Sequence, residues 1–210
     1  MMETLSSETG LAPQFSPHAA LPPEEQARAY HYALVSRLFF APPDRSLAEH
    51  LGAAETAAGN AALGRARQLL RQACQAADLE GVRSEYEELF IGTGKSPVAL
   101  YTSYYAASRS PDRHLLSLRQ RLVELGVARP DEVVETEDHI SGVCDVMRWL
   151  IESRQEIGEQ REFFERFLAP AGGPLCDAIV GAPASNFYRA VAGFAAAFFR
   201  VEQAAFGMEP

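Results

Sequence analysis

The chain has 210 residues, enough for one globular domain or for two small lobes that share a core. Although 47% of the residues are hydrophobic, no uninterrupted run of about 18 apolar residues occurs, so the sequence predicts no membrane-spanning helix. The net charge of −9 argues against a nucleic-acid-binding protein, which needs a basic surface, and weakly favours cationic partners.

The N-terminal stretch, residues 1–23, predicts a flexible tail because it is rich in Ser, Thr, Pro and Gly. It lacks the basic start and the apolar block of a secretory signal, so we expect a cytoplasmic protein. Cys74, Cys144 and Cys176 lie far apart and form no CxxC pair or Cys/His cluster. This spacing predicts buried thiols instead of disulfides or a zinc site.

Residues 24–210 predict a single all-α domain, because apolar residues recur at helical spacing and no strand pattern or internal repeat is found. We expect a globular bundle of roughly eight to eleven helices, with a connector at 127–138 that could be a hinge between two helical lobes. The predicted helices span 24–40, 44–51, 60–77, 81–90, 101–109, 111–125, 138–156, 159–168 and 185–203, with a short helix before the last.

Several helix ends are marked by capping residues. Asp44, Ser110 and Ser185 are predicted N-caps, and Gly126 is predicted to end the helix over 111–125. The first helix is expected to bury one face made of Ala27, Tyr30, Leu34 and Leu38.

The letters GTGKS, Gly92 to Ser96, resemble the end of a nucleotide-binding phosphate loop. Such a loop requires GxxxxGK[ST] after a strand, but Leu89 occupies the first glycine position and the preceding segment has helical periodicity. Pro97 also disfavours the helix that should begin at Ser96. A phosphate loop is therefore disfavoured, although a looser nucleotide-binding loop over Gly92–Ser96 stays an alternative.

A first group of candidate binding residues surrounds this loop. Aromatic and aliphatic side chains with polar tips suit a groove that accepts an apolar peptide while hydrogen-bonding its backbone. Leu89 and Phe90 could instead be core residues. The candidates are Tyr86, Leu89, Phe90, Tyr101, Ser103 and Tyr104.

A second group lies between Pro130 and Met147, where six acids occur without Lys or Arg. Grouped carboxylates beside an apolar groove are suited to a cationic peptide, and the candidates are Glu135, Asp138 and His139. Glu137 and Asp138 could instead cap the helix that follows. The segment lacks HExxH spacing for a metal, and no nucleophile motif accompanies the Asp-His pair, so we expect neither a metal site nor a catalytic residue.

Together, the segments EYEELFIGTGKSPVALYTSYY and ETEDHISGVCDVMRWL resemble the TorD/DmsD/NarJ family of molybdoenzyme-specific chaperones. Members carry an aromatic-x-x-Leu-Phe segment, a Gly-rich loop and Pro-Tyr/Trp-x-Ser, followed by a Glu-Pro-x-Asp-His motif that opens a helix. The first motif here is Tyr86, Leu89, Phe90, Tyr101 and Ser103, and the second is Glu135, Asp138 and His139. The chain departs from the pattern at Thr93, Leu100 and Thr136, where proline is usual.

The resemblance implies an all-helical, cytoplasmic protein that is not an enzyme and carries no cofactor. Members bind the twin-arginine leader, or the N-terminus, of a molybdenum-containing reductase or dehydrogenase subunit and hold it until its cofactor is inserted, before export. The implied partners are therefore this leader and the apo form of the subunit. The machinery that inserts the molybdenum cofactor is a further candidate partner. Acids near Glu135 to Asp138 would meet the arginines, and the tyrosine-lined groove would cover the apolar segment.

Overall fold

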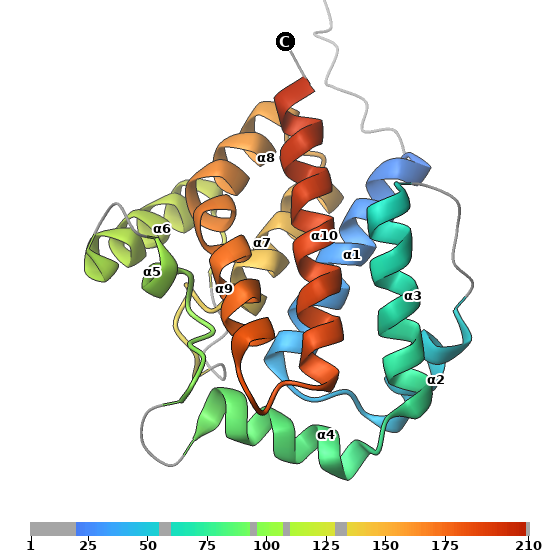
Figure 1. Ribbon diagram of the computed structural model, residues 1–210. Coiled ribbons are helices and arrows are strands. Elements are labelled where there is room, and N and C mark those ends of the chain that lie inside the picture. The colour runs from blue at the N-terminus through green and yellow to red at the C-terminus, as the bar shows by residue number, and fades with distance from the viewer. Residues whose placement is uncertain (1–19, 55–59, 93–95, 107–109, 129–133, 209–210) are drawn as a thin grey trace, which may run out of the picture.

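A computed structural model of the chain describes residues 20–54, 60–92, 96–106, 110–128 and 134–208. In these ranges the regular elements are all helical, which confirms the predicted all-α bundle (Figure 1). Residues 1–19 of the predicted tail (1–23) and residues 129–133 of the predicted hinge lie outside the described residues. The α-helices are α1 (Pro23–Phe40), α2 (Arg45–Ala53), α3 (Ala61–Ala76), α4 (Leu79–Tyr86), α5 (Thr102–Tyr105), α6 (Pro111–Leu125), α7 (Ile140–Glu152), α8 (Ile157–Phe163), α9 (Ala169–Gly181) and α10 (Phe187–Met208).

Two helices contain a wider π-helical turn. The segment η1 (Glu87–Ile91) continues α4, and η2 (Phe164–Leu168) joins α8 to α9. The prediction treated 81–90 and 159–168 as ordinary helices, because a π-turn keeps nearly the same apolar spacing. Single π-turns often occur near functional sites, and η1 contains Leu89 and Phe90 of the predicted first motif.

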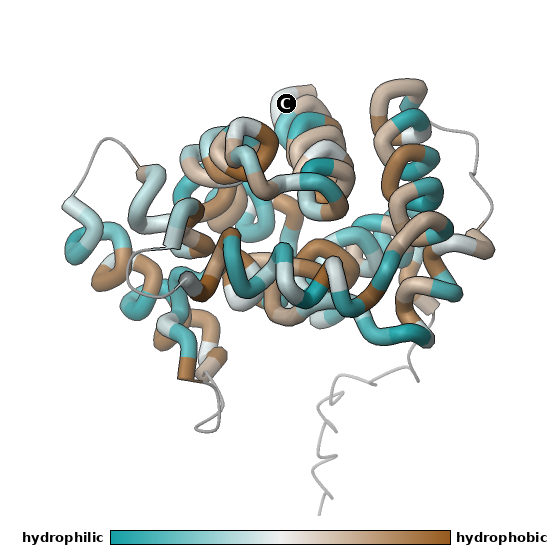
Figure 2. Tube along the Cα trace, turned by 60° about the horizontal axis from the view of Figure 1, so that its bottom comes forward, coloured by the Kyte–Doolittle hydropathy of each residue, from teal (hydrophilic) through white to brown (hydrophobic). Residues whose placement is uncertain are grey.

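The helices pack around α1, α7 and α10. Helix α1 lies along α7, while α10 packs between α3 and α9, and α4 runs across the lower ends of these helices in Figure 1. Hydrophobic and hydrophilic positions alternate along the helices, as expected when each buries one face (Figure 2). Among the described residues, no helix is long and apolar enough to cross a bilayer.

The core is rich in aromatic side chains, and its largest fully buried members come from α1, α8, η2 and α10: Tyr32, Phe39, Phe163, Phe164, Phe167, Tyr188, Phe194 and Phe198. The predicted buried face of α1 is partly wrong, because Ala27 and Tyr30 are exposed while Leu34 and Leu38 are buried. Apolar residues occur on several sides of this helix, so spacing alone does not select the face that meets α7 and α10.

The N-terminus of α10 is capped from another helix. The predicted N-cap Ser185 is wrong: its buried hydroxyl has no hydrogen-bond partner. Instead, the carboxylate of Glu85 on α4 accepts hydrogen bonds from the backbone N–H groups of Asn186, Phe187 and Tyr188, at 2.8, 3.0 and 2.8 Å. The carboxylate therefore satisfies otherwise free donors and complements the helix dipole.

The other predicted helix ends are confirmed. Asp44 accepts a hydrogen bond from the N–H of Leu47 at 2.8 Å, and Ser110 accepts one from Arg113 at 3.4 Å. Gly126 ends α6 in the left-handed conformation with φ 68°. These caps use residues adjacent in sequence, so local pattern was sufficient to find them.

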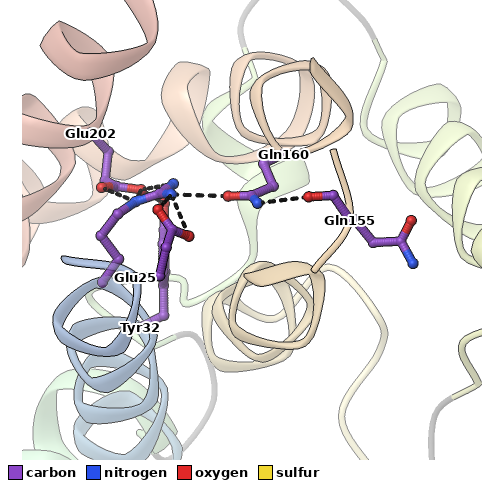
Figure 3. A network of polar contacts seen from close by, with 6 residues as sticks. Glu25, Tyr32, Gln155, Gln160 and Glu202 are labelled. Atoms are coloured by element: carbon purple, nitrogen blue, oxygen red, sulfur yellow. Dashed lines mark hydrogen bonds and ion pairs between the residues drawn. The ribbon is translucent and has the colours of Figure 1, made fainter. Parts of the chain in front are cut away.

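A buried ion pair fastens α1 to α10 at one end of the bundle (Figure 3). The guanidinium of Arg28 donates to the carboxylate of Glu202 at 2.8 Å, and the hydroxyl of Tyr32 donates to the same carboxylate at 2.8 Å. Arg28 also donates to the side-chain oxygen of Gln160 at 3.0 Å, which brings α8 into the network. The Glu202 carboxylate is thus buried but fully paired.

Candidate functional site

The two predicted motifs meet through a short backbone bridge. Tyr101 and His139 pair in antiparallel fashion. The N–H of Thr102 donates to the carbonyl of Asp138, and the N–H of Ile140 donates to the carbonyl of Leu100, both at 2.8 Å. The segment that precedes α5 is therefore joined to the segment that opens α7.

Side chains reinforce this bridge. The hydroxyl of Tyr101 donates to the carboxylate of Glu135, and the hydroxyl of Ser103 donates to that of Asp138. Thr136 donates to the other oxygen of Asp138 at 2.6 Å. The structure therefore brings together five of the predicted site residues, Tyr101, Ser103, Glu135, Asp138 and His139.

The alternative interpretation of Asp138 expected it to cap α7, but it does not. Asp138 is 2% exposed, and each of its carboxylate oxygens accepts a hydrogen bond from a hydroxyl group. The N-cap is His139, whose Nδ1 accepts a hydrogen bond from the N–H of Ser141 at 3.3 Å. Glu137 does not cap the helix either, and it forms an ion pair with Arg119 at 2.9 Å.

Burial shifts the pKa values of His139 and Tyr101, the two residues paired in the bridge. It lowers the pKa of His139, against the opposing attraction of Glu135 and Asp138, so the imidazole is neutral at pH 7. Because Nδ1 accepts from Ser141, the proton lies on Nε2. Burial, followed by the hydrogen bond to Glu135 and its charge, raises the pKa of Tyr101, which keeps the phenol protonated as a donor.

The other aromatic residues of the first motif are core residues. Tyr86 and Phe90 are 8% exposed and Leu89 is fully buried. The hydroxyl of Tyr86 donates to the carbonyls of Phe39 and Phe40, at 3.1 and 2.9 Å. Leu89 and Phe90 therefore pack in the core, as their alternative interpretation expected, and a role of these three residues in peptide binding stays a prediction. Tyr104, by contrast, is 61% exposed.

A cavity of about 270 Å³ opens beside the bridge, between the end of α1, α6, and one face of α7. Three carboxylates line it, those of Glu135, Glu137 and Asp145, and no lysine or arginine is among its described lining residues. Its apolar lining comes from Phe40, Leu122, Val127, Val146 and Trp149. The cavity therefore combines negative charge with an apolar wall.

The carboxylates are accessible to different degrees. The side chain of Glu137 is 17% exposed, whereas that of Asp145 is 49% exposed. Asp145 accepts a hydrogen bond from Ser36 on α1 at 2.9 Å, which fixes its orientation beside Trp149. Of these two carboxylates, Asp145 is therefore the more accessible to an additional cation.

Comparison with known proteins identifies the family. The model of the nitrate reductase delta subunit family matches residues 56–177. The chain belongs to this family. The TorD/DmsD/NarJ resemblance is thereby confirmed, and the family is one of chaperones for redox-enzyme maturation.

Individual relatives of this delta-family chain are distant. An uncharacterized protein of Haemophilus influenzae is 28% identical over 115 residues, which cover 55% of this chain and 56% of the relative. The match thus spans about half the length of that curated relative. A crystal structure of a candidate redox enzyme maturation protein from Archaeoglobus fulgidus is 19% identical, with a TM-score of 0.49 over 90% of this chain and 99% of that one.

The alternative of a nucleotide-binding loop over Gly92–Ser96 gains no support from the structure. The segment before Gly92 is the π-helical η1 instead of the strand that a phosphate loop requires. Thr93, Gly94 and Lys95 lie outside the described residues. Within the described ranges, no three His, Cys, Asp or Glu side chains are placed to hold a metal ion, and the three cysteines are free and buried.

Sequence reasoning missed much of the cavity wall. Ser141, Asp145 and Trp149 recur every four residues, so they share one face of α7. From this spacing, the sequence could have predicted that Trp149 lies on the same face of the helix as Asp145 of the acidic segment. Phe40 carried no such signal, because α1 and α7 meet only through tertiary packing.

Proposed function

We propose that this chain is a cytoplasmic chaperone that binds the twin-arginine leader, or the N-terminus, of a molybdenum-containing oxidoreductase subunit. It holds the subunit until the cofactor is inserted, before export. The cavity beside the Tyr101–His139 bridge is the observation that supports this proposal most directly. Membership of a maturation-chaperone family supports the same function.

The cavity has the chemistry that an arginine-bearing peptide requires. A guanidinium group can form paired hydrogen bonds with the carboxylate of Asp145 and stack on the indole of Trp149. Glu137 is paired with Arg119 at 2.9 Å and Asp145 with Arg148 at 3.4 Å. The incoming cation gains most from Asp145, because its carboxylate is the more exposed of the two and its existing ion pair is the longer one. The apolar segment that follows the arginines in a leader would cover Phe40 and Val146.

In this proposal the bridge positions the site. Tyr101 and Ser103 hold Glu135 and Asp138 by hydrogen bonds, so these residues fix the segment that forms one side of the cavity. They act on the peptide through the shape of that segment, with Asp138 itself buried. Exposed Tyr104 lies next to them in sequence and is available for the apolar part of the leader.

The test is isothermal titration calorimetry with a synthetic leader peptide that carries two adjacent arginines followed by an apolar segment. We expect binding that weakens as salt rises from about 0.05 to 0.5 M, because the contacts are ionic and partly exposed. A peptide with both arginines replaced by glutamine should bind about tenfold more weakly or worse.

The matched protein variants are Asp145→Asn, in the cavity, and Glu152→Gln, an exposed acid on the same helix that does not line it. We expect Asp145→Asn alone to reduce affinity, by about tenfold. No detectable binding of the leader, or equal losses in the two variants, would contradict the proposal.

A further inference from the structure

A second cavity, of about 180 Å³, lies between α1, α2, α3 and α10, away from the acidic site. Its apolar interior is formed by the buried side chains of Leu34, Leu51, Leu70 and Phe194. An engineered apolar cavity of about 150 Å³ in another protein is large enough to bind benzene. The present cavity can therefore contain one ring-sized apolar group.

The polar lining of this cavity is cationic, although the chain as a whole carries a net charge of −9. Arg67 and Arg71, one turn apart on α3, line it together with His31 of α1. The described lining residues include no carboxylate. In the part of the chain that the structure describes, neither arginine forms an ion pair.

The hydrogen bonds of these groups leave donors free. The Nε of Arg71 donates a hydrogen bond to the carbonyl of Gly52 at 3.1 Å. The terminal nitrogens of its guanidinium are therefore available to donate to a ligand. One terminal nitrogen of Arg67 contacts Nε2 of His31. Since an arginine has five N–H donors, both side chains retain donors for a ligand.

His31 lies beside Arg67 in this cavity, with no carboxylate among the described lining residues. Burial, followed by repulsion from Arg67, lowers the pKa of His31 to about 4. Burial also lowers the pKa of Arg67. An anion held by the arginines would stabilise the charged forms of both residues.

We propose that this cavity is a binding site for a small organic carboxylate with an aromatic or short aliphatic body. The body occupies the space among Leu34, Leu70 and Phe194, and the carboxylate accepts hydrogen bonds from Arg67 and Arg71. Paired N–H donors of arginine match the two oxygens of a carboxylate. The site is separate from the acidic cavity, so this inference does not depend on leader binding.

Benzoate is the probe, and two-dimensional NMR of the histidine side chains is the readout. We expect saturable binding at concentrations up to about 10 mM, with a rise in the pKa of His31. Benzyl alcohol, which has the same ring without the charge, should bind about tenfold more weakly or worse. Phenyl phosphate separates the two anion chemistries, and binding about tenfold tighter than benzoate would overturn the assignment to carboxylates.

The matched variants lie on one helix. Arg67→Gln should reduce benzoate affinity by about tenfold, whereas Arg65→Gln, an exposed arginine on α3 outside the cavity, should leave it unchanged. Circular dichroism confirms that both variants fold, and Arg71→Gln replaces Arg67→Gln if the latter does not. Unchanged His31 signals at the highest benzoate concentration, equal affinity for benzyl alcohol, or equal losses in both variants would overturn the proposal.

Discussion

The hydroxyl of Ser103 donates a hydrogen bond to the buried carboxylate of Asp138, and this contact joins α5 to the turn that precedes α7. The two motifs that stand out in the sequence are therefore halves of one structural unit. The backbone bridge between Tyr101 and His139 passes through the same place. Under the proposed function, we expect residues of this unit to affect a ligand of the neighbouring acidic cavity through the shape of its wall.

This unit predicts energetic coupling between Ser103 and Asp138. Asp138→Ala should lower the free energy of unfolding by about 1–3 kcal/mol, because Ser103 and Thr136 lose their acceptor. Ser103→Ala should cost less, and a double-mutant cycle measured by urea denaturation should give a coupling energy of about 1 kcal/mol. Strictly additive effects would show that the hydrogen bond contributes nothing to stability.

The cap of α10 gives a second prediction. Glu85→Ala should lower the free energy of unfolding by about 1–2 kcal/mol, because three N–H groups lose their acceptor. Ser185→Ala should be close to neutral, since its hydroxyl is buried without a partner. Glu88→Ala, an exposed acid in η1, is the control. A larger loss for Ser185→Ala than for Glu85→Ala in chemical denaturation would restore Ser185 as the cap.

A third prediction concerns the buried ion pair of Figure 3. Glu202→Gln should lower the free energy of unfolding by about 3 kcal/mol, since Arg28 is left with its charge largely buried. Glu25 contacts the same arginine at 2.8 Å, but its side chain is 29% exposed. Glu25→Gln should therefore cost at most about 0.5 kcal/mol. Thermal and urea denaturation of the two variants provide the comparison, and similar costs would contradict the assignment of Glu202 as the main partner.

His31 predicts a pH dependence of stability. Its pKa is lowered from 6.5 to about 4, so the unfolded chain binds the proton more readily. The contribution is therefore fully present above about pH 6.5 and is lost as the pH falls towards about 4, and the total loss over this range is roughly 3 kcal/mol. Urea denaturation between these pH values should show a weaker pH dependence for His31→Gln than for the unaltered chain.

The control for this titration is Gln68→Ala, because Gln68 is exposed on α3 and its side chain does not titrate. It should leave the pH dependence unchanged. Carboxylates also titrate in this range, so the informative quantity is the difference between each variant and the unaltered chain. Parallel curves for His31→Gln and the unaltered chain would show that burial of His31 does not disfavour its charged form.

The fold was predictable because most of its determinants are local. Helical spacing and adjacent caps such as Asp44 and Ser110 identify the helices without any knowledge of their partners. The cap of α10 was not predictable in this way, since Glu85 acts from a different helix. Likewise, the sequence around an aromatic residue such as Phe90 does not distinguish a position in a groove from a position in the core.

The candidate site was predictable only in part for the same reason. The sequence identified the acidic segment and the Tyr101–Ser103 segment, and the structure places them together. It did not indicate that Asp138 would be buried, because its hydroxyl partner Ser103 belongs to another element. The role of these residues in peptide binding stays a prediction.

Trp149 offers a direct readout of the acidic cavity. It is the single tryptophan of the chain and it lines the cavity. A leader peptide that enters should therefore change the tryptophan fluorescence. Because the signal comes from one residue, it reports occupancy at this site without contributions from elsewhere in the protein.

Phe40→Ala tests the apolar wall with this readout. Phe40 is 52% exposed at the end of α1, so its removal should change the free energy of unfolding by about 0.5 kcal/mol or less. If a leader buries this ring, the lost apolar contact should weaken binding by about tenfold. Val123→Ala is the matched control, since Val123 is 79% exposed on α6 and does not line the cavity. Equal affinities of Phe40→Ala and Val123→Ala would show that the leader does not cover the end of α1.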